Sequence, residues 1–374
     1  MQIFKYMNKK HLKITLSALL LTTIIWSCRK EQGVIPEEQT QLPGQITAVN
    51  GLYLLNEGNF GSNKASLDYY DYATGFYRKN IYGQANPSAT LGLGDVGNDI
   101  KIYGSKLYVV VNNSNKVEVL DVKTAKKIKQ IDIPNCRYIT FYKEKAYVTA
   151  YDGYVAVIDT TALVVGTKIN VGQQPEEMAV VGSKLYVANS GGYNYPNYER
   201  TVSVIDLNTN LEIKRIDVDV NLHRLKADQY GDIYVTSRGD YNTIPSNLYV
   251  IDTKTDAVKK KFNVAASSIA IDKDFAYVYS VEWNNATSSN KISYSKINVK
   301  DETIIPGDFI TDNTAKDIIL PYCIAVDPLS SDIYVTDAKD YVSPGTLYCF
   351  DKNGRKKFSV TTGDIPGHIV FYTK

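Results

Sequence analysis

Tyrosine, tryptophan, asparagine and arginine are concentrated in segments between strand-like stretches of the chain, where their side chains could contact a ligand. Such segments are residues 190–200, 238–245, 282–285 and 339–344. Aromatic rings with polar tips offer a large contact area at small entropic cost, and amides and guanidinium groups add adaptable hydrogen bonds. This chemistry suits a bulky, amphipathic molecule better than a small ion.

The candidate ligand-binding residues form two groups. Those expected to give apolar contact are Tyr138, Tyr193, Tyr195, Tyr198, Tyr241, Trp283, Tyr322 and Tyr341. Those expected to orient amides or a phosphate are Asn56, Asn112, Arg137, Arg224 and Arg238. The competing interpretation is structural, because tyrosine also favours β-strands and the chain contains 30 of them.

Residues that could support catalysis or hold a metal are sparse. Outside the first 28 residues the only histidines are His223 and His368, and neither has metal-ligand spacing. Residues 92–97 fit a Gly-x-Gly-x-x-Gly string, but no helix is expected to follow, so the phosphate-loop context fails. Carboxylates that could ring a central channel and bind calcium are Glu57, Asp152 and Glu177, although solvated rim charges explain them more simply. We therefore expect a binding protein without a metal or catalytic residues.

The elements that would position these residues form a repeat. Six strands have an aromatic residue at or near their centre, at 106–110, 145–149, 184–188, 232–236, 275–279 and 332–336. Strands with a closing polar residue end at Asp71, Asp121, Asp159, Asp206, Asp252, Asn298 and Asp351. The resulting period of about 40 to 50 residues is that of β-propeller blades. Strands alternating with period two have two faces to bury, and radial stacking of the sheets buries both.

The two ends of the repeat region predict how the ring closes. Residues 51–56 match the second strand of the unit, with no inner strand before them. Residues 366–371 match the inner strand at 175–180, so they would complete the first blade. The sequence thus predicts an all-β, seven-bladed β-propeller over residues 51–374. The variable connections that carry the candidate residues would gather on one face of it.

The first 50 residues have the pattern of an export signal and a tether. Lys9, Lys10 and Lys13 precede the apolar run 14–26, which is too short to span a bilayer, and Ser27-Cys28 follows the run. This resembles a lipoprotein signal over residues 1–28 with lipidation at Cys28; an uncleaved anchor with an incidental cysteine is the alternative. Residues 29–50 are polar and predict a flexible tether. Arg29 rather than Asp favours the outer membrane, and we expect the cell surface, with the periplasmic face as the alternative.

Charge and cysteine content exclude two further classes of protein. The chain has 42 basic and 40 acidic residues, and removal of residues 1–28 would leave 38 against 40. This near-neutral balance gives no electrostatic footprint for nucleic acid. The remaining cysteines, Cys136, Cys323 and Cys349, are odd in number and irregular in spacing, so we expect buried thiols rather than a disulfide framework.

Several motifs resemble known propeller families. Residues 147–149 with 155–159, and 186–189 with 202–206, are similar to the repeats of YncE or YVTN-type propellers. A closer resemblance, to the surface lipoprotein propellers of gut Bacteroidetes, is carried by residues 55–60, 69–71, 93–96, 111–114, 137–139 and 363–367. That family, often labelled surface layer proteins, includes the cobalamin-capturing lipoprotein BtuG. The resemblance implies a seven-bladed propeller that lies over a TonB-dependent transporter and hands it cobalamin or another corrinoid.

Two other functions stay open at this point. One is an enzyme of the lactonase, lyase or quinoprotein-like type, which would bring carboxylates or histidines together at the channel mouth. The other is a structural or protein-binding surface component, which would present a flat loop face.

Overall fold

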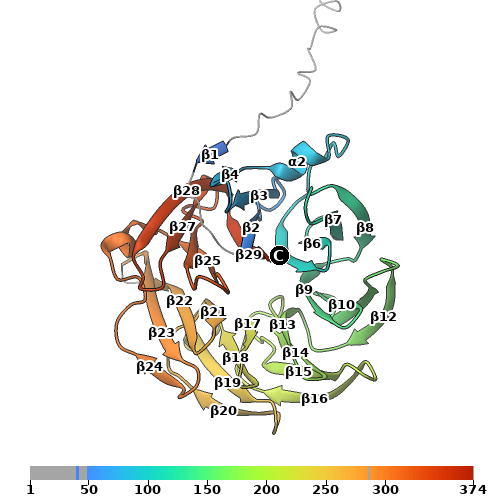
Figure 1. Cartoon of the computed structure of the whole chain (residues 1–374). Helices are drawn as coiled ribbons and strands as arrows, with labels where there is room; N and C mark the ends of the chain where they lie inside the picture. The colour runs from blue at the N-terminus through green and yellow to red at the C-terminus, as the bar shows by residue number, and fades with distance from the viewer. Residues whose placement is uncertain (1–38, 42–48, 285–286, 374) are drawn as a thin grey trace, which may run out of the picture. The chain divides into compact units, whose positions relative to one another are not determined.

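The computed structural model describes residues 39–41, 49–284 and 287–373, which form seven antiparallel sheets arranged as a ring (Figure 1). The predicted signal segment with Cys28, and tether residues 29–38 and 42–48, lie outside the described residues. Within the described ranges, no helix is long and apolar enough to cross a membrane. The predicted all-β, seven-bladed propeller is confirmed.

Six blades have four strands in chain order, with the first strand innermost. Blades 2 and 3 consist of β5 (Gly97–Tyr103), β6 (Lys106–Val111), β7 (Lys116–Asp121) and β8 (Lys127–Asp132), then β9 (Cys136–Tyr142), β10 (Lys145–Ala150), β11 (Tyr154–Asp159) and β12 (Val165–Asn170). Blades 4 and 5 consist of β13 (Pro175–Val181), β14 (Lys184–Asn189), β15 (Thr201–Asp206) and β16 (Leu211–Asp217), then β17 (Leu222–Ala227), β18 (Asp232–Ser237), β19 (Asn247–Asp252) and β20 (Ala257–Lys261). Blades 6 and 7 consist of β21 (Ser268–Asp272), β22 (Phe275–Asn284), β23 (Ser289–Asn298) and β24 (Thr303–Ile305), then β25 (Pro321–Val326), β26 (Ile333–Asp337), β27 (Pro344–Phe350) and β28 (Lys356–Asp364).

Blade 1 joins the two ends of the described chain. Its strands β2 (Val49–Asn56), β3 (Ser66–Asp71) and β4 (Phe76–Arg78) follow an inner strand, β29 (Pro366–Thr373), from the C-terminal end. β29 pairs antiparallel with β2, with Leu54 opposite Ile369, so the predicted closure is confirmed. A fifth strand, β1 (Gln39–Gln41), pairs with the outer edge of β4. Two short helices, α2 (Ile81–Ala85) and η1 (Asn313–Asp317), lie in the connections.

The core consists of apolar clusters that join neighbouring blades. One of them packs Tyr108 and Val110 of blade 2 against Val148 and Ile158 of blade 3. Strand tyrosines at equivalent positions are fully buried in this way, so they are structural. All eight clusters fall between Val49 and Tyr372, and the chain from Glu37 onward forms one compact unit. Residues 37–374 therefore contain a complete folding unit.

The repeated aspartates are turn residues. The carboxylate of Asp121 accepts hydrogen bonds from the backbone N–H groups of Lys123 (3.0 Å) and Thr124 (2.9 Å). Asp159 accepts two equivalent bonds, both of 2.9 Å. Such Asx turns let the chain reverse from the third strand to the fourth. The most regular chemical feature of the sequence thus shapes the turns of the blades.

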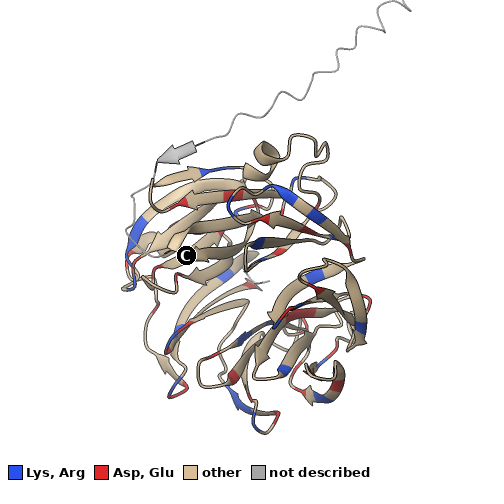
Figure 2. Ribbon diagram, turned by 45° about the vertical axis from the view of Figure 1, so that its right-hand side comes forward, with Lys and Arg blue, Asp and Glu red and all other residues tan. Residues whose placement is uncertain are grey.

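Charged side chains are distributed over the sheets rather than gathered by sign. In the view of Figure 2, Lys and Arg are interspersed with Asp and Glu over the strands and loops. The three described cysteines, Cys136, Cys323 and Cys349, are buried free thiols, as predicted.

Candidate functional site

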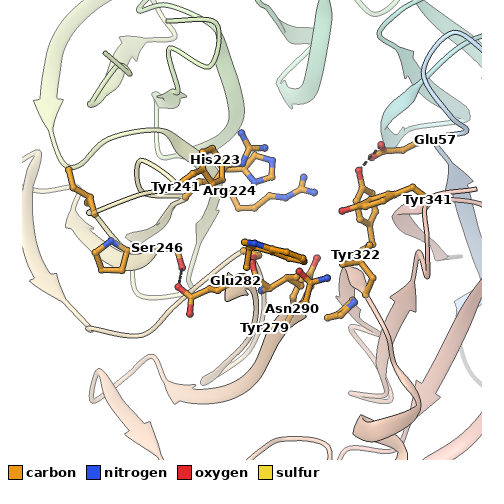
Figure 3. A pocket seen from close by; sticks show the side chains of 18 of the residues that line it. Glu57, His223, Arg224, Tyr241, Ser246, Tyr279, Glu282, Asn290, Tyr322 and Tyr341 are labelled. Atoms are coloured by element: carbon orange, nitrogen blue, oxygen red, sulfur yellow. Dashed lines mark hydrogen bonds between the residues drawn. The ribbon is translucent and has the colours of Figure 1, made fainter. Parts of the chain in front are cut away.

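A cavity of about 890 Å³ opens where the inner strands begin. Its walls come from the β18–β19 and β26–β27 connections and from the ends of β22 and β23, and its base from the first residues of β9, β17 and β25 (Figure 3). It is lined by Glu57, Asn98, Arg137, Tyr138, His223, Arg224, Arg238, Tyr241, Asn242, Thr243, Ile244, Pro245, Ser246, Ser267, Tyr279, Val281, Glu282, Trp283, Asn290, Leu320, Pro321, Tyr322 and Tyr341.

Two arginines of the cavity share one buried carboxylate, that of Glu176 on β13. Arg137 donates to Glu176 Oε2 from Nε (3.2 Å) and from Nη2 (3.0 Å), and Arg238 donates to Oε1 (3.2 Å). The Tyr151 hydroxyl also donates to Oε1, at 2.6 Å. Burial alone would raise the pKa of Glu176, but Arg137 and Arg238 bring it below its usual value. Glu176 is therefore an anion that fixes both guanidinium groups.

Arg224 differs from these two arginines because no carboxylate is paired with it among the described residues. Its side chain is buried, with 8% of the residue exposed, and its Nη1 donates to the Tyr138 hydroxyl at 2.9 Å. The guanidinium group also lies 5.3 Å from the centre of the Tyr138 ring. The same hydroxyl lies 3.1 Å from His223 Nε2. In Figure 3, Arg224 extends toward the middle of the cavity.

Glu57 lies on the opposite side of the cavity and is only weakly acidic. Burial raises its pKa to about 7, despite the Tyr322 hydroxyl that donates to Oε2 at 2.9 Å and the charges of Arg137 and Arg224. Its Oε1 lies 3.7 Å from Nε2 of His368. Burial and nearby arginines lower the pKa of His368 well below its usual value, so this histidine is neutral. Glu57 is thus a carboxyl group that exchanges a proton near neutral pH.

The aromatic side of the cavity is exposed. Trp283 is 61% exposed, Tyr241 is 69% exposed and Tyr341 is 46% exposed. Glu282 and Trp283, expected in a loop, instead extend β22 and pair with Lys291 and Asn290 of β23. The prediction was wrong because alternating residues with strand preference continue the hairpin. This longer hairpin carries Trp283, which lines the cavity.

Tyr241 and Tyr341 are presented by the same local motif, which sequence reasoning missed. Each follows an aspartate whose carboxylate caps the turn: Asp240 accepts from Asn242 N (2.9 Å), and Asp340 accepts from Val342 N (3.0 Å). Both tyrosines have positive φ, 60° and 65°. A tyrosine in this conformation is uncommon, and such residues concentrate at functional sites. The available signal was Asp-Tyr-x-Thr/Ser, present in both connections.

The structure brings most of the predicted contact residues together. Those that line the large cavity are Arg137, Tyr138, Arg224, Arg238, Tyr241, Trp283, Tyr322 and Tyr341. Tyr193 and Tyr198 line a smaller cavity of about 140 Å³, which also has Arg238 and Tyr241 in its wall. Lining residues that were not predicted include Tyr279, Asn290 and Leu320, which lie on or beside strands without a distinctive pattern.

Three predicted contact residues lie outside both cavities. Asn56 is fully buried and donates from Nδ2 to Ser66 Oγ at 3.1 Å. The Asn112 amide donates to the carbonyl of Cys136 at 2.8 Å, which holds the turn after β6. Tyr195 is 70% exposed and packs edge-on against Tyr198, with ring centres 6.0 Å apart.

The three carboxylates considered for calcium do not meet. Glu177 pairs with Lys226, and Asp152 accepts from Asn135 Nδ2 at 2.9 Å on the rim. Across the residues that the structure describes, no group of three His, Cys, Asp or Glu side chains could hold a metal ion.

The solved structures with similar folds belong to proteins with different functions. A quinoprotein alcohol dehydrogenase-like protein from Bacteroides thetaiotaomicron has a TM-score of 0.66 at 16% identity, over 87% of this chain and 79% of that one. Hydrazine synthase from Kuenenia stuttgartiensis has a TM-score of 0.58 at 17% identity, over 69% and 77%. The Pan2 WD40 domain of Neurospora crassa has a TM-score of 0.54 at 13% identity, over 73% and 81%. At these identities the likeness shows the propeller fold alone.

Sequence comparison gives a family. None of the curated proteins compared with the chain is significantly similar to it. Residues 50–371 match DUF5074, described as a domain of unknown function, and this range covers blades 1 to 7 almost completely. The chain therefore belongs to the DUF5074 family, whose domain is here a seven-bladed β-propeller.

Proposed function

We propose that this chain is a non-enzymatic binding protein that captures a bulky, ring-bearing nutrient in the large cavity. The supporting observation is a cavity of about 890 Å³ with exposed aromatic rings on one side and, at its base, the buried Arg224 beside the partly buried Arg137 and Arg238. Small-molecule sites generally occupy about 300–1,000 Å³ and combine apolar walls with a few fixed polar groups. A structural component with a flat loop face is less consistent with this hollow.

Our best candidate for the ligand is cobalamin or another corrinoid. This choice derives from the resemblance of residues 55–60 and 363–367, among others, to the surface lipoprotein propellers. Lipidation at Cys28 would attach the protein to the outer membrane, at the cell surface, beside a TonB-dependent transporter that accepts the ligand. A tether to the same membrane would raise the effective concentration at handover.

A titration of residues 37–374 with cyanocobalamin tests this proposal. We expect heat release in calorimetry and a change in the visible absorbance of the corrin, both saturating at one ligand per chain. Replacement of Trp283 with Ala should weaken both signals. If heat and spectrum stay unchanged at micromolar protein, the corrinoid assignment is wrong and other ring-bearing nutrients become the next ligands to test.

An enzymatic role is the second candidate, and one observation favours it. Glu57, with a pKa of about 7, lies at the cavity beside His368, and a general acid or base works best with a pKa near the operating pH. Prolonged incubation with cyanocobalamin or with simple lactones, followed by mass spectrometry, would detect a product. Turnover that disappears in Glu57→Gln would establish this role, and a ligand recovered unchanged would argue against it.

A further inference from the structure

We propose that the ligand of the large cavity carries an oxyanion, a carboxylate or phosphate group, which binds Arg224. This inference deepens the proposed binding function and depends on it. It starts from the balance of buried charges around the base of the cavity, and it names the chemical class of the ligand rather than one compound.

Most cations around the inner strands have carboxylate partners. Lys101 pairs with Asp99 at 3.4 Å, and Lys226 pairs with Glu177. Glu176 serves both Arg137 and Arg238, as described above. Two further carboxylates, Glu57 and Glu282, line the cavity, and they accept hydrogen bonds from the hydroxyl groups of Tyr322 and Ser246. Among the described residues, Arg224 has no carboxylate within ion-pair distance.

Arg224 has hydrogen-bonding capacity to spare. Its Nε is buried and has no hydrogen-bond partner among the described residues. The one bond that is found for its guanidinium group goes to Tyr138, a neutral phenol. A buried charged group with unpaired donors is costly, whereas a carboxylate or phosphate can accept two parallel bonds from a guanidinium group. The site is therefore preorganised for an oxyanion.

The neighbouring histidines do not add to this positive charge, and the lowered pKa of His223 is partly a consequence of it. Burial lowers the pKa of His223 well below its usual value, and Arg238, Arg224 and Arg137 lower it further. His223 is neutral and contacts the Tyr138 hydroxyl. The positive charge at the base of the cavity thus resides on the guanidinium groups, which bind oxyanions well.

The location of the exposed rings completes the description of the ligand. Tyr241 and Trp283 line the same cavity as Arg224, and in Figure 3 Arg224 lies between the Tyr241 side and the Glu57–Tyr322 side. A molecule that satisfies both features has a flat or ring-bearing body with an oxyanion attached. An uncharged ring system would leave Arg224 uncompensated.

Two fluorescent probes that differ mainly in charge test the inference. 8-Anilinonaphthalene-1-sulfonate carries an anionic group, whereas N-phenyl-1-naphthylamine has a similar ring system without it. With residues 37–374 at pH 6, we expect the sulfonate to bind at least tenfold more tightly. Arg224→Gln should remove this preference and leave the affinity for the neutral probe unchanged. Millimolar inorganic phosphate should displace the sulfonate but not the neutral probe.

Matched variants separate this inference from the binding function itself. Arg215→Gln is the control, because Arg215 is an exposed residue of β16 that pairs with Glu212 at 2.9 Å. Trp283→Ala should weaken both probes. Equal affinity for the two probes, or a preference that survives in a folded Arg224→Gln protein, would overturn the oxyanion inference while the cavity still binds. Should Arg224→Gln fail to fold, the charge-retaining Arg224→Lys and the phosphate competition decide. If neither probe binds, both the oxyanion inference and the proposed binding function are overturned.

Discussion

Blades 2–4 and blades 5–7 share the same four-stranded plan but contribute very differently to the cavity. Of the 23 lining residues, 19 come from blades 5–7 and three from blades 2–4, with Glu57 added by blade 1. The strands of blades 2–4 all have six or seven residues, whereas β22 and β23 in blade 6 have ten each. The difference therefore lies in the connections and in this longer hairpin, and it shows that a repetitive scaffold can acquire a one-sided cavity while the apolar clusters between its blades are kept.

The connections of blades 2–4 contact the backbone or other rings rather than the large cavity. Asn112 bonds the neighbouring backbone, and the long connection of blade 4 packs Tyr195 on Tyr198, and Tyr198 on Tyr241 of blade 5, with ring centres 6.0 and 6.2 Å apart. The aromatic residues of blades 5–7 that line the cavity lie on capped turns or, at Trp283, on an extended hairpin. The long connection of blade 4 thus contributes no residue to the large cavity, so length alone does not decide which connections form it.

The largest effect is expected from the core, and it should be the same in both halves. Leu107→Ala in blade 2 and Ile233→Ala in blade 5 each remove a fully buried side chain. Each should lower the free energy of unfolding by about 2–5 kcal/mol. Denaturant unfolding of residues 37–374 measures both, and a much smaller loss in one half would mean that the scaffold is not equivalent there.

Glu57 should make the stability fall as the pH rises. Its pKa is raised to about 7, so between about pH 4.5 and 7 the folded chain binds more protons than the unfolded chain. This penalty reaches about 3 kcal/mol above pH 7 and is absent below about pH 4. The neutral histidines act in the opposite direction up to about pH 6.5, since they must lose a proton to fold. The informative measurement is thus the difference in unfolding free energy between Glu57→Gln and the parent protein. This difference should grow from zero at pH 4 to its maximum at pH 8, and a difference that does not change with pH would contradict the raised pKa of Glu57.

Trp283→Ala and Tyr195→Ala form a matched pair across the two halves. Both side chains are largely exposed aromatic groups, 61% and 70%, but only Trp283 lines the large cavity. We expect Trp283→Ala to weaken ligand binding by about 2 kcal/mol, roughly 30-fold in Kd, and Tyr195→Ala to leave it unchanged. Calorimetry with the ligand, beside melting curves for both variants, makes the comparison. Equal losses of ligand affinity in the two variants would mean that the long connection of blade 4 also contacts the ligand.

The smallest effect is expected at Asn112. Asn112→Ala removes one hydrogen bond of 2.8 Å to the Cys136 carbonyl, which should lower the unfolding free energy by about 1 kcal/mol. Ligand affinity should not change. Loss of ligand affinity without loss of stability would mean that Asn112 contacts the ligand.

The architecture was predictable because several separate features of the repeat indicate the same fold. The period, the turn aspartates and the match between residues 51–56 and 366–371 each indicate a closed ring, and β29 beside β2 confirms it. The convergence of Arg137, Arg224 and Tyr322 also follows from the pattern, since all three lie at the starts of inner strands, Arg137 and Tyr322 at the second position and Arg224 at the third.

The details of the site were less predictable because they depend on non-repeated local choices. The continuation of β22 through Trp283 arose from strand pairing with β23, which a four-residue loop assignment had excluded. The raised pKa of Glu57 depends on burial by chain segments about 265 and 311 residues away, at Tyr322 and His368. No local pattern reports such surroundings.

The closing strand has a consequence for the timing of assembly. The backbone N–H of Glu57 bonds to the carbonyl of Ile365 at 2.8 Å, and Leu55 is paired with His368. Glu57 lines the cavity, so the seam between the first and last segments of the propeller lies beside the cavity wall. A chain whose last strand has not yet paired with β2 lacks the hydrogen bond that holds the backbone at Glu57, and its cavity is complete only once the ring has closed.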